Sequence, residues 1–123
     1  MSGLPAVEKL IDQYCAAWSE ADAAHRRDLL SAVWCAGATY TDPKVHLVGV
    51  DELVAHIDQV IARRPGARVV RTSAVDEHHG FVRFAWRVEQ ADGAMLLEGI
   101  DIAEVAGDGI HGIIGFFGQP AAR

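Results

Sequence analysis

The sequence contains few of the features that mark three large classes of protein. Only two cysteines occur among 123 residues, and Cys15 and Cys35 both lie in apolar patterns, so we expect buried thiols of a reducing compartment. The formal net charge of −6 argues against a nucleic-acid-binding surface. No apolar run approaches a membrane span, and the N-terminal segment MSGLPAVEKL lacks a signal-peptide core. We therefore expect a cytoplasmic protein with neither a nucleic-acid nor a membrane partner.

Several motifs of metal-dependent and nucleophilic catalysis are also missing. No pair of His, Cys, Asp or Glu residues has the spacing of a metalloenzyme site, and the adjacent His78 and His79 would point to opposite faces of a strand. No serine lies in a nucleophile elbow, and the glycines of GDGIHGIIGFFG follow no phosphate-loop pattern. We expect no metal and no cofactor.

The composition and the order of the elements predict a single α+β domain over residues 1–123. Half of the residues are hydrophobic and 23% are charged, which is typical of a globular chain with a real core. Apolar spacing predicts helices over 5–21, about 25–35, and from Gly49 to the Pro65-Gly66 breaker. Strands are predicted over 38–41, 67–76, 81–90, 95–105 and 110–117, the last four separated by HHG, ADG and GDG. Helices followed by an antiparallel meander predict helices packed on one face of a curved sheet.

One of these strands carries an aspartate on its apolar side. In EGIDIAEV, residues 98–105, Asp101 shares a face with Gly99 and Ala103, which is the face more suited to burial. A buried carboxylate is costly unless it is paired, hydrogen-bonded or protonated. Asp101 is therefore either a structural acceptor or a carboxyl held in an apolar pocket, where it donates a hydrogen bond or acts as a base of raised pKa.

Three other residues could take part in chemistry, and each has a structural alternative. Tyr14, in the apolar stripe of the first helix, is a core tyrosine or an oxyanion donor. Asp42, just before Pro43, is a turn former or a general base at a strand end. His56, beside the apolar stripe of the third helix, is a core histidine or a pocket histidine that titrates near neutrality. The residues expected to contact substrate are Trp18, Trp34, His56, Phe84, Trp86 and Phe116.

Four segments together resemble the SnoaL-like branch of the nuclear transport factor 2 (NTF2)-like superfamily. They are QYCAAWSEAD in the first helix, ATYTDP before the loop, GVDEL at the third helix, and GIDIAEVAGDGIHGIIGFFG at the end. The superfamily includes ketosteroid isomerases, polyketide cyclases, scytalone dehydratase and limonene epoxide hydrolase. The resemblance implies a cone-shaped NTF2-like fold, with three N-terminal helices packed on a curved antiparallel sheet. The fold hosts many chemistries and does not by itself supply a function.

The resemblance also assigns roles to individual residues. By similarity to ketosteroid isomerases, Tyr14 and a protonated Asp101 would form the oxyanion hole, and Asp42 would be the base. Polyketide cyclases of the family also use a late-strand aspartate, which again matches Asp101. The aspartate and two histidines of the dehydratase are loosely imitated by Asp42, His46 and His56. The arginine-x-aspartate pair of the epoxide hydrolases is missing, because residue 99 is glycine.

The function expected from these residues is cofactor-free proton transfer on a small, apolar, enolisable ketone. One alternative is a non-catalytic module that binds an apolar metabolite or serves in dimerisation. Another is a polyketide cyclase or dehydratase led by Asp101 with His56. A homodimer is expected, because the last strand is rich in Ile and Phe and because members of the superfamily form dimers.

Overall fold

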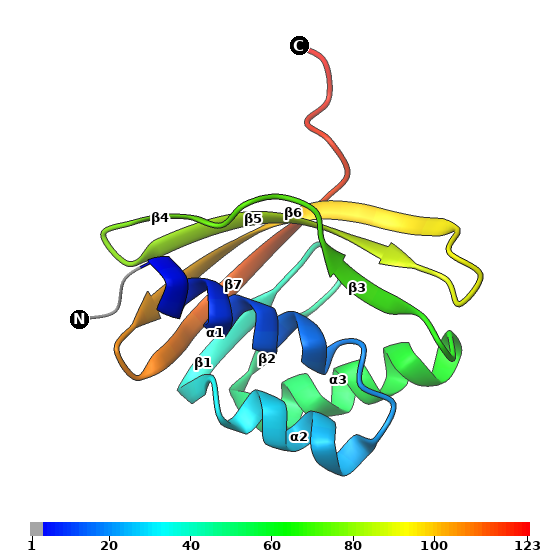
Figure 1. The fold of residues 1–123 in the computed structure, drawn as a ribbon, viewed down its shortest axis with the longest axis horizontal. Coiled ribbons are helices and arrows are strands. Elements are labelled where there is room, and N and C mark those ends of the chain that lie inside the picture. Colours follow the sequence, from blue (N-terminus) through cyan, green and yellow to red (C-terminus); the bar gives the residue numbers. More distant parts are fainter. Residues whose placement is uncertain (1–3) are drawn as a thin grey trace.

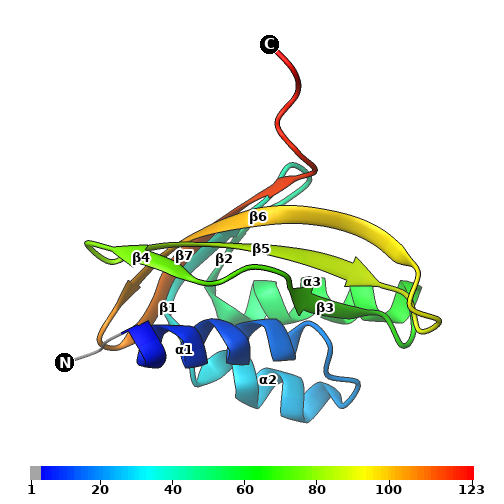
Figure 2. The ribbon, with the colours of Figure 1, turned by 45° about the horizontal axis from the view of Figure 1, so that its top comes forward.

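The computed structural model describes residues 4–123 as three helices on one side of a curved sheet (Figures 1 and 2). The helices are α1 (Leu4–Ala17), α2 (Ala23–Ser31) and α3 (Gly49–Arg63). The strands are β1 (Trp34–Thr41), β2 (His46–Val48), β3 (Arg68–Arg71), β4 (Asp76–His78), β5 (Phe81–Glu89), β6 (Met95–Ala106) and β7 (Gly109–Phe117). The predicted α+β fold is confirmed. No helix in the described part of the chain is long and apolar enough to cross a membrane.

The sheet is mixed, which differs in one pairing from the predicted antiparallel arrangement. Its strand order is β2-β1-β7-β6-β5-β3. Strand β3 pairs with the second half of β5, and β4 pairs with the first three residues of β5. The β5–β6–β7 meander is antiparallel as predicted, but β1 runs parallel to β7. The two strands can pair in this way because α3 and the strands after it separate them in the chain, as a parallel crossover requires.

The helix boundaries follow local chemistry, with two corrections. The first helix, predicted over 5–21, ends at Ala17, because the backbone N–H groups of Trp18 and Ser19 bond to the carbonyls of Cys15 and Ala16 in a turn. The Asp22 side chain caps α2 by accepting hydrogen bonds from the backbone N–H groups of Ala24 and His25. Helix α3 has Asp51 and Glu52 in its first turn and Arg63 in its last, as the dipole rule predicts. The prediction that the second helix reaches residue 35 is wrong, because α2 ends at Ser31 and strand β1 already begins at Trp34.

The strand predictions also need correction in the first half of the sheet. The predicted strand over 67–76 is two short strands, β3 and β4, which pair with different ends of β5. Strand β2 is absent from the sequence prediction, because its three residues are too few for an alternating pattern.

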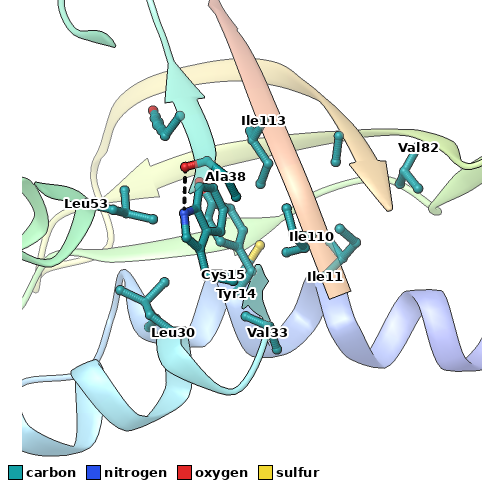
Figure 3. Close-up of a cluster of buried hydrophobic side chains, with 14 of the residues drawn as sticks. Ile11, Tyr14, Cys15, Leu30, Val33, Ala38, Leu53, Val82, Ile110 and Ile113 are labelled. Atoms are coloured by element: carbon teal, nitrogen blue, oxygen red, sulfur yellow. Dashed lines mark hydrogen bonds between the residues drawn. The ribbon is translucent and has the colours of Figure 1, made fainter. Parts of the chain in front are cut away.

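The core lies between the helices and the sheet (Figure 3). Helices contribute Ile11, Leu30 and Leu53, and strand β7 contributes Ile110 and Ile113, all with no exposed surface. Burying each such side chain contributes about 1.5–3 kcal/mol.

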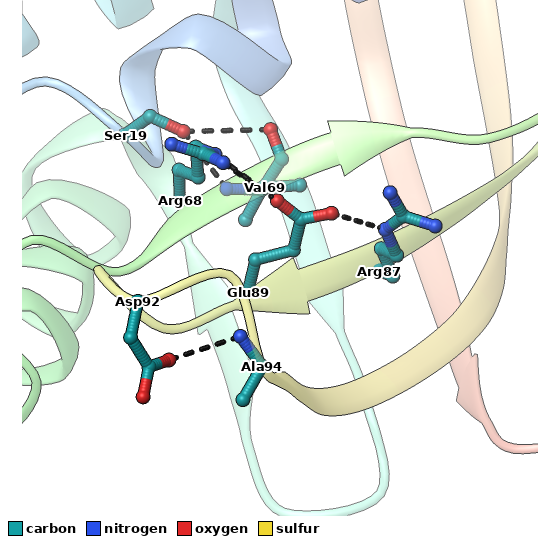
Figure 4. Close-up of polar contacts among 7 residues, drawn as sticks. All are labelled: Ser19, Arg68, Val69, Arg87, Glu89, Asp92 and Ala94. Atoms are coloured by element: carbon teal, nitrogen blue, oxygen red, sulfur yellow. Dashed lines mark hydrogen bonds and ion pairs between the residues drawn. The ribbon is translucent and has the colours of Figure 1, made fainter.

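Polar contacts connect the segment after α1 to β3, and connect β3 to β5 (Figure 4). The Ser19 hydroxyl accepts a hydrogen bond from the Val69 backbone N–H at 2.8 Å and donates to the Val69 carbonyl at 3.4 Å. The buried Glu89 carboxylate pairs with Arg68 at 2.9 Å and with Arg87. The Arg68–Glu89 pair holds β3 beside β5, and the Ser19 contacts hold β3 beside the end of α1.

Candidate active site

A cavity of about 490 Å³ lies between the sheet and helices α1 and α3. It is lined by predicted site residues from α1, α3, β5, β6 and the segments directly after α1 and β1, namely Tyr14, Trp18, Asp42, His56, Phe84, Trp86 and Asp101. Other lining residues include Cys15, Tyr40, Lys44, Arg63, Arg64 and Phe117. The three candidate catalytic residues therefore share one cavity.

Asp101 is a buried carboxyl with an indole as its hydrogen-bond partner. Its side chain is in the middle of β6, and only 5% of the residue is exposed. The Trp86 indole Nε1–H donates to Asp101 Oδ1 at 2.8 Å. Gly99 makes room for this indole, because a Cβ at residue 99 would lie 2.5 Å from the Trp86 ring.

Burial changes the protonation of Asp101. Desolvation raises its pKa to about 7; the hydrogen bond from Trp86 opposes this shift, and the charge of Asp42 adds to it. At neutral pH a large share of the molecules therefore carries a neutral Asp101, which can donate a hydrogen bond into the cavity.

Tyr14 is a buried phenol supported from behind by an indole. Its ring stacks on Trp34 with centroids 6.0 Å apart and planes inclined by 16°. Burial raises the Tyr14 pKa well above its usual value, and the nearby Asp101 raises it further. The phenol thus keeps its proton at physiological pH and can act only as a neutral hydrogen-bond donor or acceptor.

Asp42 follows β1 directly and is held by three hydrogen bonds. Its Oδ1 accepts from the backbone N–H groups of Lys44 (2.8 Å) and Val45 (3.1 Å), and its Oδ2 accepts from the Tyr40 hydroxyl at 2.8 Å. Asp42 therefore forms the turn, as one interpretation of the sequence predicted, and also lines the cavity. Tyr40 was missed, although it lies two residues before Asp42 and so shares its face of the strand.

Gly115 lies beside both Asp101 and Asp42. It pairs with Asp101 across β6 and β7. A Cβ at this position would lie 2.8 Å from Asp101 Oδ1 and 3.7 Å from Asp42 Cβ. The absence of a side chain at residue 115 therefore leaves room for the Asp101 carboxyl beside Asp42.

His56 is partly buried in the cavity wall beside two aromatic rings. Its ring centroid lies 5.9 Å from that of Trp18 and 6.3 Å from that of Tyr40. Burial lowers the His56 pKa, Arg63 lowers it further, and the Asp42 charge opposes both, so the imidazole is mainly neutral at pH 7. His46 is exposed and shares a hydrogen bond with the Thr41 hydroxyl, and it does not line the cavity. The dehydratase-like trio of Asp42, His46 and His56 is therefore not brought together.

Two of the residues expected to contact substrate do not line the cavity. Trp34 is buried behind Tyr14, and its indole N–H donates to the Ala38 carbonyl at 3.1 Å. Phe116 is 60% exposed on the outer face of the sheet. Gly115 pairs with Asp101 and faces the cavity, so the next residue of the strand, Phe116, faces the opposite side. The next residue, Phe117, lines the cavity instead and contacts Trp86 edge-on with centroids 6.0 Å apart.

Three cationic side chains, Lys44, Arg63 and Arg64, also line the cavity, and all three are exposed. Within residues 4–123 none of them forms a salt bridge. The cavity thus combines an apolar, aromatic wall with two carboxyls inside and positive charge where it meets solvent.

The closeness of Gly115 to Asp101 predicts a specific effect of Gly115→Ala. The new Cβ would displace the Asp101 carboxyl and break its hydrogen bond with Trp86, which we expect to cost about 1–3 kcal/mol of stability. In an NMR spectrum, the indole N–H resonance of Trp86 should move upfield. Gly112→Ala on the same strand is the matched control, because its Cβ would come no closer than 3.4 Å to any heavy atom. Equal spectra for the two variants would contradict the described geometry.

No protein-family model and no curated protein matches the chain, but many solved structures do. One is a candidate isomerase of the SnoaL-like family from Agrobacterium tumefaciens, with 30% identity over 90% of this chain and 96% of that chain and a TM-score of 0.84. An NTF2-like protein of unknown function from Exiguobacterium has 19% identity over 90% and 99% of the two chains and a TM-score of 0.71. A candidate polyketide cyclase from Sinorhizobium meliloti has 12% identity over 87% and 93% and a TM-score of 0.70.

The curved sheet, the helices on one side and the cavity between them define an NTF2-like protein, and the latter two structures agree in fold. The similarity to the Agrobacterium protein extends over nearly all of both chains. The chain belongs to the SnoaL-like family.

Proposed function

We propose that the protein is a cofactor-free enzyme that transfers a proton within a small, apolar, enolisable ketone. The observation that carries this proposal is that two carboxyl groups line one cavity but differ in burial and in hydrogen bonding. Asp42 is partly exposed and accepts three hydrogen bonds, whereas Asp101 is buried and, within residues 4–123, has only the Trp86 indole as side-chain partner. Two carboxyls in contrasting environments are suited to separate base and acid roles.

In the proposed reaction, Asp42 removes a proton from the carbon next to the ketone. The electron pair of the broken C–H bond forms the enolate, whose oxygen accepts hydrogen bonds from the Tyr14 hydroxyl and the protonated Asp101. Asp42 then returns the proton to the same carbon or to a conjugated one, which regenerates the starting enzyme. Donors aimed at the developing negative charge inside a dry cavity lower the barrier more than they would in water.

The cavity wall also constrains the substrate. Trp18, Phe84 and Phe117 offer an apolar surface for a ring system. Lys44, Arg63 and Arg64 are exposed and place positive charge only where the cavity meets solvent, so the apolar part of the substrate lies deeper, against the aromatic wall.

A phenol that resembles an enolate tests the proposed oxyanion site directly. 2-Naphthol should bind the wild type and quench its tryptophan fluorescence, since Trp18 and Trp86 line the cavity. Tyr14→Phe and Asp101→Leu each remove one donor and should weaken binding about fivefold or more, corresponding to about 1 kcal/mol for a lost buried hydrogen bond. Asp101→Asn is the matched control, because an amide keeps both an acceptor for Trp86 and a donor for the ligand. Equal affinity for all four proteins would contradict the oxyanion site.

His56 favours a second candidate, cyclase- or dehydratase-type chemistry led by Asp101. Its neutral imidazole lines the same cavity and could exchange a proton with a bound substrate. This candidate requires His56, whereas the proton transfer by Asp42 does not. A ligand-binding module without catalysis is the third candidate, and it would bind 2-naphthol but show no turnover of ketones.

We also propose a homodimer formed through the outer face of the sheet. Ile114 and Phe116 are 51% and 60% exposed there, beside their cross-strand partners Ile102 and Ile100. Exposed apolar clusters of this kind commonly mark interaction sites.

The dimer can be tested by sedimentation at micromolar concentration. Phe116→Arg should shift the protein to monomer, because a charge would be buried at the centre of the interface. Leu4→Arg alters another exposed apolar residue, at the start of α1, and should leave the dimer intact. A monomeric wild type would overturn the proposal.

A further inference from the structure

A cysteine, an aspartate and a histidine converge at the end of the sheet where β6 turns into β7. Cys35 is the second residue of β1, Asp108 is in the turn, and His111 is the third residue of β7. The parallel pairing of β1 with β7 places Trp34 opposite Ile110, so Cys35 and His111 become neighbours although they are 76 residues apart in sequence. None of the three residues lines the cavity that holds Asp42 and Asp101.

The three side chains point their ligand atoms at one another. His111 Nε2 lies 3.6 Å from Cys35 Sγ and 2.8 Å from Asp108 Oδ1. All three ligand atoms lie within 4.8 Å of each other. For tetrahedral zinc, bonds of about 2.3 Å to sulfur and 2.0–2.1 Å to nitrogen put these two atoms about 3.6 Å apart. The sulfur and the imidazole are therefore already at the right separation, and the carboxylate needs to retreat by about 0.6 Å to reach a similar geometry.

We propose that Cys35, Asp108 and His111 form a binding site for a divalent transition metal, with zinc as the best-matched ion. Thiolate, imidazole and carboxylate are the three ligand types that zinc uses in proteins. Asp108 and His111 are exposed, so a fourth position is open to water or to another ligand. The site is independent of the proposed proton transfer, because no residue is shared.

The backbone holds the three ligands together. Gly109, between Asp108 and Ile110, adopts a φ of +132°, which residues with side chains rarely adopt. A Cβ at this position would lie 2.5 Å from the Val33 carbonyl oxygen and 3.3 Å from Cys35 Sγ. Glycine is thus the residue that lets the turn approach β1 closely enough for Asp108 and His111 to face the thiol.

The surroundings of Cys35 do not suit a nucleophile. Burial and the neighbouring Asp108 carboxylate both raise the pKa of the thiol. A catalytic cysteine has its pKa lowered by positive charge instead. A divalent cation would reverse these electrostatics, because it displaces the thiol proton and neutralises the carboxylate.

Cobalt(II) titration of the full chain tests the site, because cobalt replaces zinc and reports thiolate ligation by a near-ultraviolet charge-transfer band. We expect one equivalent of Co²⁺ to produce this band and Zn²⁺ to bleach it. Cys35→Ser should abolish the band. His111→Gln should weaken Co²⁺ binding by about tenfold or more. Changing a residue that only hydrogen-bonds to a metal ligand already costs about tenfold, and loss of a ligand should cost at least as much. Circular dichroism of both variants checks that they are folded.

Two adjacent histidines elsewhere on the sheet provide the control. His78, at the end of β4, and His79, in the turn that follows, are exposed, and their Nδ1 atoms lie 3.2 Å apart. The double change His78→Gln and His79→Gln should leave the cobalt band and the affinity unchanged. Absence of the band in the wild type, or its survival in folded Cys35→Ser, would overturn the proposal.

Discussion

Replacing Asp42 by Asn is expected to abolish proton exchange at the carbon next to a bound ketone. Asparagine keeps the shape of the side chain and still accepts hydrogen bonds from the turn N–H groups, so the fold should be retained. It cannot accept the substrate proton, however, and loss of a positioned base costs a factor of roughly 10²–10⁴ in rate. The measurement is NMR of 2-tetralone in D2O, in which α-proton exchange is followed without knowledge of the natural substrate. The enol of this ketone has the ring and oxygen arrangement of 2-naphthol.

Two matched variants make the Asp42 experiment decisive. Asp76→Asn changes an exposed aspartate that pairs with Arg83 on the sheet and does not line the cavity, and it should leave the rate unchanged. His56→Gln should reduce the rate only modestly if Asp42 is the base. Full activity of Asp42→Asn would show that the assigned base is wrong. Loss of activity in His56→Gln alone would favour the cyclase- or dehydratase-type alternative.

Replacing Asp101 by Asn is expected to change how stability depends on pH. The Asp101 pKa is about 7 in the folded protein, compared with about 3.9 in an unfolded chain. Between these two pH values the folded state holds a proton that the unfolded state has lost. The protonated Asp101 therefore adds on the order of a few kcal/mol to the free energy of unfolding. This contribution is complete below pH 4 and is lost as the pH rises through 7. The Asp101→Asn variant has no titrating proton at this position and therefore no such dependence.

Urea unfolding of both proteins at pH 5 and pH 8 measures this difference. The free energy of unfolding of Asp101→Asn, relative to wild type, should rise between the two pH values, because the wild type then contains an ionised, buried carboxylate. Other titrating groups cancel in the comparison. A difference that is the same at both pH values would contradict the raised pKa.

The same titration should appear in ligand binding. If the protonated Asp101 donates to the enolate mimic, 2-naphthol affinity of the wild type should fall as the pH rises through about 7. The affinity of Asp101→Asn should stay constant over this range. An identical pH dependence in the two proteins would assign the effect to another group, such as His56.

Patterns among residues close in sequence were sufficient to predict much of the fold and the orientation of Asp101. Alternation along residues 98–105 predicted that Asp101 faces the apolar side, and it is 5% exposed in the structure. Charges and breakers predicted α3 closely, and Asp-Gly turns predicted the β5–β6–β7 meander. These features depend on residues close in sequence, whose periodicity and turn chemistry act before any long-range contact forms.

Pairings between distant segments were decided only by the tertiary structure. The parallel contact of β1 with β7 brings Cys35 beside His111, and no spacing along the chain predicts it. The register of β7 against β6 turns Phe117 toward the cavity and Phe116 away from it, since a shift of one residue exchanges the two faces of a strand. Periodicity alone thus determined that Asp101 would face an apolar interior, whereas packing of distant elements decided that Tyr14 and Asp42 share a cavity with it.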